Sequence, residues 1–136
     1  QVGILGSSNG SVWAINSNCH ANLKCQVKAR MGGTVLISSS GGSFATGGVG
    51  IGNPAVRAET GGHIEAYSIK IYDNGGDGIS ANGGTVECTG AAVTNNCGIG
   101  VVARNGGKIY YSSITDTGNG AVSYADAISV IGANYV

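Results

Sequence analysis

A short phrase with two adjacent glycines recurs along this chain at regular intervals. Its copies are ARMGGTV at 29–35, AETGGHI at 58–64, ANGGTV at 81–86 and ARNGGKI at 103–109, with partial copies NGSV at 9–12 and GANY at 132–135. The second glycine, or the residue in its place, falls at positions 10, 33, 62, 84, 107 and 133, which gives spacings of 23, 29, 22, 23 and 26 residues. A repeat of this length predicts a solenoid, in which each repeat forms one turn, or coil, stacked on the next.

The residues after each glycine pair alternate between two kinds. The second position is always β-branched: Val12, Val35, Ile64, Val86 and Ile109. The third position varies widely: Trp13, Leu36, Glu65, Glu87 and Tyr110. A period of two predicts a β-strand whose second position faces a core and whose first and third positions face outward. Equivalent positions of successive coils should then lie about 4.7–4.9 Å apart, the spacing of neighbouring strands.

Each repeat carries two further short strand signals, separated by turns rich in Asn, Asp and Gly, which tolerate left-handed backbone angles. Three strands and three turns in about 22 residues predict one coil of a parallel β-helix. We therefore predict an all-β fold, a right-handed single-stranded parallel β-helix with about five coils of 22–29 residues in one domain, 1–136. The longest repeat predicts an insertion loop at about 38–54, on a face that solenoids often use for binding.

Neither end of the repeat series carries a polar capping element. A bare solenoid end exposes unpaired strand edges and apolar side chains. We therefore expect the stack to continue in a longer chain or to be covered by partner chains.

Composition gives no indication of a nucleic-acid or membrane partner. Seven basic and seven acidic residues give zero net charge, so electrostatics offer no argument for nucleic acid or for an anionic membrane. No apolar run approaches the length that spans a bilayer. We predict no nucleic-acid partner and no membrane insertion.

Two stretches carry a resemblance to a known family. They are GISA at 78–81 followed by Gly83 and Gly84, and GVVA at 100–103 followed by Gly106 and Gly107. Repeats of this form resemble the pectate-lyase-like parallel β-helix segments of bacteriophage tailspike and tail-fibre proteins. The resemblance implies a homotrimer on the virion tail, acting outside the cell, in which this segment is structural and binds host surface polysaccharide. Because many such proteins also cleave that polysaccharide, a depolymerase is the alternative function, and a bacterial surface adhesin is a second alternative.

Outward carboxylates are the candidate catalytic groups. Glu65 and Glu87 occupy the same outward position in successive coils, so they should be neighbours about 5 Å apart, the separation used by retaining glycosidases. Asp73, in the turn that follows, is a third candidate. The alternative is a solvated ladder in which the two like charges only reduce stability slightly.

Candidate glycan-binding residues lie on the same column and in the insertion. Trp13 and Tyr110 share the outward column with the two glutamates, and their rings could stack on sugars. Phe44 lies in the predicted loop. Arg57 should lie beside Lys28, and this like-charged pair could meet an acidic sugar.

From the remaining polar residues we predict no metal site and no cofactor. Asp73, Asp77 and Asp116 could form a Ca²⁺-binding column, but aspartate is also the ordinary residue of such turns. His63 should be exposed and has no predicted partner.

The four cysteines lack the close spacing of a metal site. Cys88 occupies an inward position, where a thiol behaves as a small hydrophobe. Cys19 and Cys25 could be thiols or could close a small disulfide loop.

Overall fold

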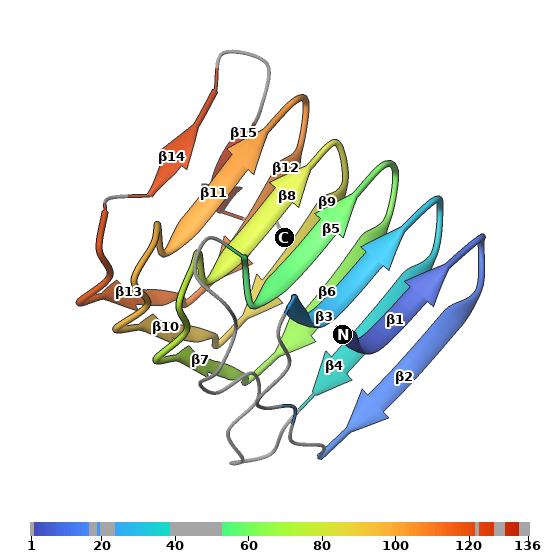
Figure 1. The fold of residues 1–136 in the computed structure, drawn as a ribbon, viewed down its shortest axis with the longest axis horizontal. Coiled ribbons are helices and arrows are strands. Elements are labelled where there is room, and N and C mark those ends of the chain that lie inside the picture. Colours follow the sequence, from blue (N-terminus) through green and yellow to red (C-terminus); the bar gives the residue numbers. More distant parts are fainter. Residues whose placement is uncertain are drawn as a thin grey trace.

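The computed structural model describes residues 2–16, 19, 24–38, 53–121, 123–126 and 130–133 (Figure 1). These residues form strands and no helix. The strands are β1 (Val2–Ser7), β2 (Ser11–Ile15), β3 (Cys25–Arg30), β4 (Thr34–Ser38), β5 (Val56–Glu59), β6 (His63–Tyr67), β7 (Lys70–Tyr72), β8 (Ile79–Asn82), β9 (Thr85–Thr89), β10 (Ala92–Thr94), β11 (Val101–Arg104), β12 (Lys108–Ser112), β13 (Thr115–Thr117), β14 (Tyr124–Ala125) and β15 (Val130–Ala133).

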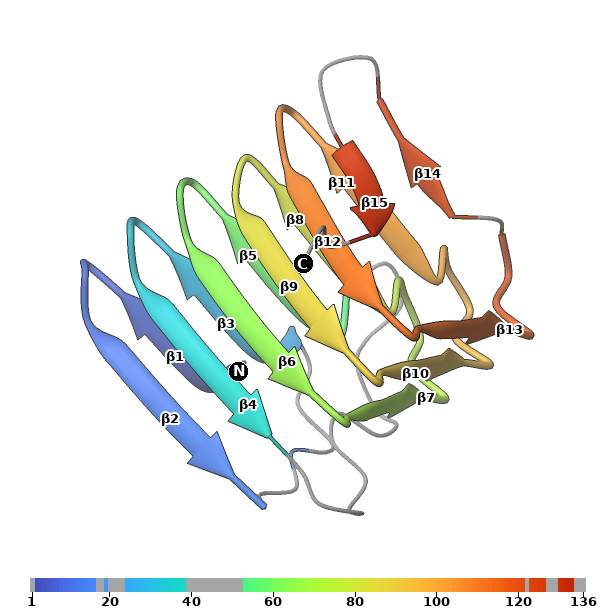
Figure 2. The ribbon, with the colours of Figure 1, turned by 180° about the vertical axis from the view of Figure 1, so that it is seen from behind.

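The strands form three parallel sheets that run along one axis (Figures 1 and 2). One sheet has the order β1-β3-β5-β8-β11-β14, a second has the order β2-β4-β6-β9-β12-β15, and a short third sheet contains β7, β10 and β13. We call them the β1 sheet, the β2 sheet and the β7 sheet. The β1 and β2 sheets face each other, and the chain passes from one to the other in each coil. The result is a parallel β-solenoid of about five turns, which confirms the predicted fold class.

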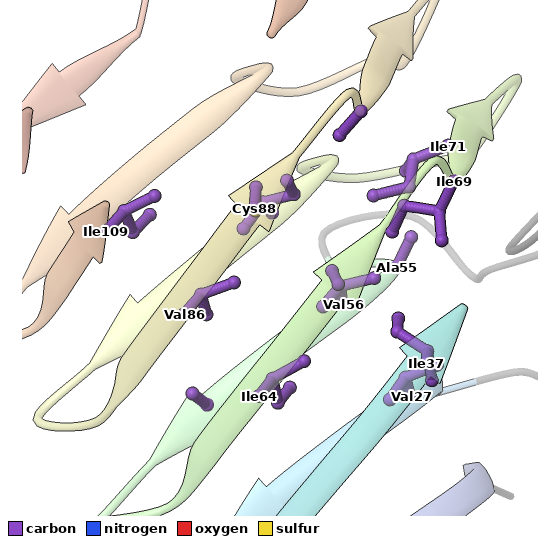
Figure 3. Packing of buried hydrophobic residues seen from close by; sticks show 14 of the residues in the cluster. Val27, Ile37, Ala55, Val56, Ile64, Ile69, Ile71, Val86, Cys88 and Ile109 are labelled. Atoms are coloured by element: carbon purple, nitrogen blue, oxygen red, sulfur yellow. The ribbon is translucent and has the colours of Figure 1, made fainter. Parts of the chain in front are cut away.

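The core lies between the sheets and is built from columns of equivalent residues (Figure 3). In the β2 sheet, Val35, Ile64, Val86 and Ile109 follow one another in register, and each is 0% exposed. Burial of a side chain of this size stabilises a fold by about 1.5–3 kcal/mol. The β-branched position that the sequence repeats is therefore the position that holds the stack together.

The glycine pairs form the tight corners between the β1 and β2 sheets. The first glycine of a pair has a left-handed backbone, with φ of 74° at both Gly61 and Gly106. The second approaches the preceding coil so closely that a Cβ on Gly107 would overlap the Ala81 carbonyl oxygen. The two glycines thus meet two different requirements, one of conformation and one of space.

The last coil differs from the sequence prediction. The partial repeat at 132–135 predicted that Ala133 would occupy the place of Gly107, but Ile131 pairs with Ile109, so the spacing is 22 residues rather than 26. The repeat also aligns residues 128–130 with 101–103 of β11, and this alignment is wrong, because Tyr124 and Ala125 pair with Val102 and Ala103. The observed register places a β-branched residue, Ile131, opposite Ile109. Continuation of this apolar column decides the register, and the glycine alignment of the last repeat does not.

The predicted insertion at 38–54 lies largely outside the described residues. Ser38 ends β4, and Asn53 and Pro54 lead into β5. Phe44, one of the predicted glycan-binding residues, is also outside the described part of the chain.

Candidate functional site

The outer face of the β2 sheet carries the column of variable residues that the repeat predicted. Trp13 pairs with Leu36, Leu36 with Glu65, Glu65 with Glu87, and Glu87 with Tyr110. Glu65 and Glu87 are therefore neighbours on adjacent strands, as predicted. Because the strands are parallel and in register, these side chains form a single row along the stack.

His63 lies beside both glutamates, although the sequence predicted no partner for it. Its Nε2 atom is 3.5 Å from Oε1 of Glu65 and 3.9 Å from Oε1 of Glu87. His63 is two residues before Glu65 on β6, so the two side chains share one face of the strand. That two-residue spacing was the signal that could have identified the contact.

Glu65, Glu87 and His63 form a polar cluster, and Tyr67 is a further member of it that the sequence analysis missed. Its hydroxyl donates a hydrogen bond of 3.0 Å to Oε2 of Glu65. That hydrogen bond is the main reason why the pKa of Tyr67 is raised, with smaller effects of burial and of the charges on Glu65 and Glu87. Tyr67 also lies two residues from Glu65 on β6, so the same spacing rule applies to it.

The carboxylates of Glu65 and Glu87 differ in their contacts and in their exposure. Glu65 has Tyr67 on one oxygen and His63 near the other. Glu87 is the more exposed of the two, with 44% of its side chain accessible against 32% for Glu65. Carboxylate oxygens accept hydrogen bonds from hydroxyl groups, and Tyr110 supplies an aromatic ring next to Glu87. The face can therefore offer both polar and stacking contacts to a polyhydroxylated ligand.

Trp13 is at the end of this row, on the edge strand β2. It is 75% exposed, the largest exposed fraction among the large apolar side chains of the described residues. Two strand spacings, about 10 Å, separate it from Glu65. Trp13 and Tyr110 thus lie on either side of the glutamate pair.

Asp73 lies away from the glutamate pair. It is an exposed residue in the turn after β7, with φ of 55°, whereas Glu65 is on β6, before the corner that leads into β7. The structure brings Glu65 and Glu87 together and places Asp73 one sheet further along each coil.

Arg57 also lies apart from the β2 sheet, on β5, where it pairs with Lys28 in register as predicted. Both cations contact Glu59: Nζ of Lys28 is 2.5 Å and Nε of Arg57 is 2.8 Å from its oxygens. An acidic sugar at this position would have to compete with the Glu59 carboxylate. The repeat also places Arg30 beside Glu59, and the two residues are register partners on β3 and β5.

Asp77 and Asp116, two of the aspartates considered for a Ca²⁺ site, accept hydrogen bonds from neighbouring residues of the stack. Oδ1 of Asp77 accepts a hydrogen bond of 2.9 Å from the backbone N–H of Ile99. Asp116 lies on β13 in register with Val93, so it occupies an inward position, and its Oδ1 accepts a hydrogen bond of 2.6 Å from Asn119. Within the described residues, no group of three or more His, Cys, Asp or Glu side chains could hold a metal ion.

A buried ladder of asparagines runs beside these turns and was not predicted. Nδ2 of Asn74 donates to Oδ1 of Asn96 over 2.8 Å, and Nδ2 of Asn96 donates to Oδ1 of Asn119 over 2.9 Å. The sequence signal was an Asn at the second residue of each turn, in Asp73-Asn74, Asn95-Asn96 and Gly118-Asn119.

The cysteines are free thiols, including Cys19 and Cys25, for which a disulfide was an open alternative. Sγ of Cys19 donates a hydrogen bond of 3.0 Å to the carbonyl oxygen of Gln26. Burial raises the pKa of Cys88 to about 12, as expected for an inward thiol. Cys97 is exposed.

The fold and this face together define a parallel β-solenoid with a flat row of aromatic and carboxylate side chains on one sheet. No family model, no curated protein and no solved structure matches the chain. In the part of the chain that the structure describes, no helix has the length and hydropathy that crossing a membrane requires.

Proposed function

We propose that this chain is a structural segment that binds surface polysaccharide through the outer face of the β2 sheet. The observation that carries the proposal is the row Trp13, Leu36, Glu65, Glu87 and Tyr110 on adjacent, in-register strands. Its aromatic rings can stack on the apolar face of a sugar, and its carboxylates can accept hydrogen bonds from the sugar hydroxyl groups.

The regular spacing of the row supports a polymeric ligand. A saccharide chain that lies along the stack meets a new side chain at each strand, about every 4.7–4.9 Å. The sheet backbone fixes the positions of these side chains, so little conformational freedom is lost on binding. A rigid flat face therefore suits an extended polysaccharide better than a small, enclosed substrate.

The proposal includes the setting implied by the repeat resemblance: a homotrimeric tailspike or tail fibre on a virion, in contact with a host cell surface. Support for this setting comes from the GISA and GVVA repeats with their glycine pairs. Sedimentation velocity tests the trimer directly, because a particle that is not a multiple of three chains contradicts it.

Binding is tested with a panel of purified bacterial capsular polysaccharides and lipopolysaccharides, with calorimetry as the readout. Replacement of Trp13 or Tyr110 by Ala should weaken binding about tenfold, since each removes one aromatic contact. Met31→Ala is the matched control, because Met31 is also an exposed apolar residue, at 54%, but lies at a corner. Equal losses in all three variants, or no binding by the unaltered chain to any member of the panel, would contradict the proposal.

A polysaccharide depolymerase is the second candidate function, favoured by the register pairing of Glu65 with Glu87. Tyr67 and His63 would hold Glu65 in place while the more exposed Glu87 faces the ligand. In this case the chain releases new reducing ends from a bound polysaccharide, and both Glu65→Gln and Glu87→Gln abolish the release. Retained release in either variant excludes this pair as the catalytic groups.

A further inference from the structure

The two glutamates at the centre of the row lie opposite each other with little compensating charge. Glu65 and Glu87 are register partners on β6 and β9, and like charges that lie directly opposite on neighbouring strands destabilise a sheet. In the described part of the chain, the only basic group within ion-pair distance of them is the ring of His63, at 3.5 and 3.9 Å. Both distances exceed the range of an N–H···O hydrogen bond, about 2.7–3.2 Å. The ring therefore compensates this pair of charges only in part.

Glu59 on the β1 sheet shows how the same chain neutralises a carboxylate fully. Lys28 and Arg57 both contact its oxygens, at 2.5 and 2.8 Å. The outer face of the β2 sheet lacks such cations next to its glutamates. Lys108 on β12 is the one Lys or Arg in the strands of this sheet; it is the register partner of Thr85 and forms no ion pair with either glutamate.

The carboxylates of Glu65 and Glu87 also have free capacity to accept hydrogen bonds. Both side chains are partly exposed. A carboxylate offers about four acceptor sites, and Glu65 uses one of them for the hydroxyl of Tyr67. The side chain of Glu87 accepts no hydrogen bond from the residues that the structure describes. The pair is therefore open to a donor supplied by a ligand.

We propose that this face selects polysaccharides that carry free amino groups, such as polymers of unacetylated hexosamine. The inference rests on the proposed function and names the class of saccharide that it takes. An ammonium group between Glu65 and Glu87 donates charge-assisted hydrogen bonds to both carboxylates and offsets the repulsion between them. The ring of Tyr110, the register partner of Glu87, adds a cation–π contact.

Other charged ligands fit this face less well. An acidic polysaccharide brings a further negative charge to the glutamate pair, and like charges placed together at an interface are unfavourable. A metal ion needs more ligands than the pair supplies, since the described residues contain no group of three or more His, Cys, Asp or Glu that could hold one. A neutral polysaccharide gains the stacking contacts but leaves the repulsion between Glu65 and Glu87 in place.

The test compares two ligands that differ only in the charge of the amine, a glucosamine oligosaccharide and its fully N-acetylated counterpart. Calorimetry measures both affinities at a pH at which the free amines are protonated. The amine form should bind about tenfold more tightly or better, because it alone makes the charge-assisted contacts. Added salt should reduce this preference, since it screens the attraction between the ammonium and the carboxylates.

Glutamine variants assign the preference to the glutamate pair. The double variant Glu65→Gln/Glu87→Gln keeps the shape of both side chains and should bring the ratio of the two affinities close to one. Glu59→Gln is the matched control, because it removes a carboxylate from the other sheet, where Lys28 and Arg57 already contact it. This variant should keep the preference of the unaltered chain. Circular dichroism checks that both proteins keep their β-structure.

The outcomes separate this inference from the proposed function. Equal affinity for the two forms, tighter binding of oligogalacturonate than of the amine form, or a preference that survives in the double variant would each overturn the inference and leave polysaccharide binding standing. A preference that Glu59→Gln also abolishes would overturn the assignment to Glu65 and Glu87. Absence of binding to both forms and to every polysaccharide of the panel contradicts the proposed function as well.

Discussion

The side-chain amide of Asn96 donates a hydrogen bond to the side-chain oxygen of Asn119, one coil further along the stack and 2.9 Å away. Asn74 repeats the interaction with Asn96 over 2.8 Å. The asparagines also bond the backbone of the preceding coil, since Nδ2 of Asn96 donates to the carbonyl oxygen of Ile71 and Nδ2 of Asn119 donates to that of Val93. The ladder therefore satisfies turn backbone groups that the β7 sheet alone would leave buried without partners.

Replacement of Asn96 by Ala should lower the free energy of unfolding by about 3 kcal/mol, because it removes the acceptor of the Asn74 backbone N–H and the donors to the Ile71 carbonyl oxygen and to the Asn119 side chain, all in a largely buried region. Chemical denaturation measures this difference. Asn95→Gly is the matched control in the same turn. Asn95 is exposed and has φ of 54°, and Gly118 occupies the equivalent place in the next coil with φ of 68°. A loss in the control as large as that in Asn96→Ala would refute a specific role for the ladder.

Gly107→Ala should reduce the free energy of unfolding by about 3 kcal/mol or more, since the new methyl group would overlap the Ala81 carbonyl oxygen and force the coils apart. Thermal unfolding followed by circular dichroism reports the effect. Gly132→Ala serves as the comparison, because a Cβ at Gly132 meets no atom within 4 Å. Equal stability of the two variants would mean that the corner tolerates separation of the coils.

Alkaline pH should destabilise the protein through Cys88. Burial raises the pKa of its thiol to about 12 in the folded state, while an exposed thiol titrates at about 8.5. The folded state therefore holds the proton more tightly, so the contribution of this group is complete below about pH 8.5 and falls as pH rises towards 12. The slope from this thiol is about 1.4 kcal/mol per pH unit.

Denaturation of the unaltered chain and of Cys88→Ala between pH 8 and pH 11 measures this effect. The variant should lose less stability over this range. Burial also raises the pKa of Cys25, so some alkaline sensitivity should persist in Cys88→Ala. Parallel stability curves for the two proteins would show that Cys88 does not titrate on unfolding in this range.

Glu59→Gln should reduce the free energy of unfolding by about 1 kcal/mol at low salt, because it leaves Lys28 and Arg57 next to each other without the carboxylate between them. Salt should reduce the difference, since it screens the repulsion between the two cations. Denaturation at low and at high salt measures both effects. Met31→Ala, which changes no charge, should show no comparable salt dependence.

The fold could be predicted because two sequence signals agree with one geometry. The glycine pairs mark the corners, and the alternation after them separates inward from outward positions, as Val35 and Ile64 show by their complete burial. Once the repeats are aligned, the pairing of Glu65 with Glu87 follows from counting residues. The last coil could not be aligned in this way, because its weak glycine match competed with the core requirement at Ile131.

The contacts of the candidate site could be predicted only in part. The row from Trp13 to Tyr110 depends on strand register, which the repeat specifies. The contacts of His63 and Tyr67 with Glu65 depend on side-chain rotamers, which the spacing permits but does not determine. The ion pairs of Glu59 could not be predicted either, because both Lys28 and Arg57 lie within reach of its carboxylate.

The corners of the solenoid have a consequence for how such a chain can change in length. Gly62 and Gly84 occupy equivalent corners, and the residues after them, His63 and Thr85, are register partners. Removal of residues 63–84 would therefore join Gly62 to Thr85 with the local geometry that each corner already has. Whole coils are in this sense interchangeable genetic units, and duplication or loss of one would lengthen or shorten the rod while the remaining coils keep their packing.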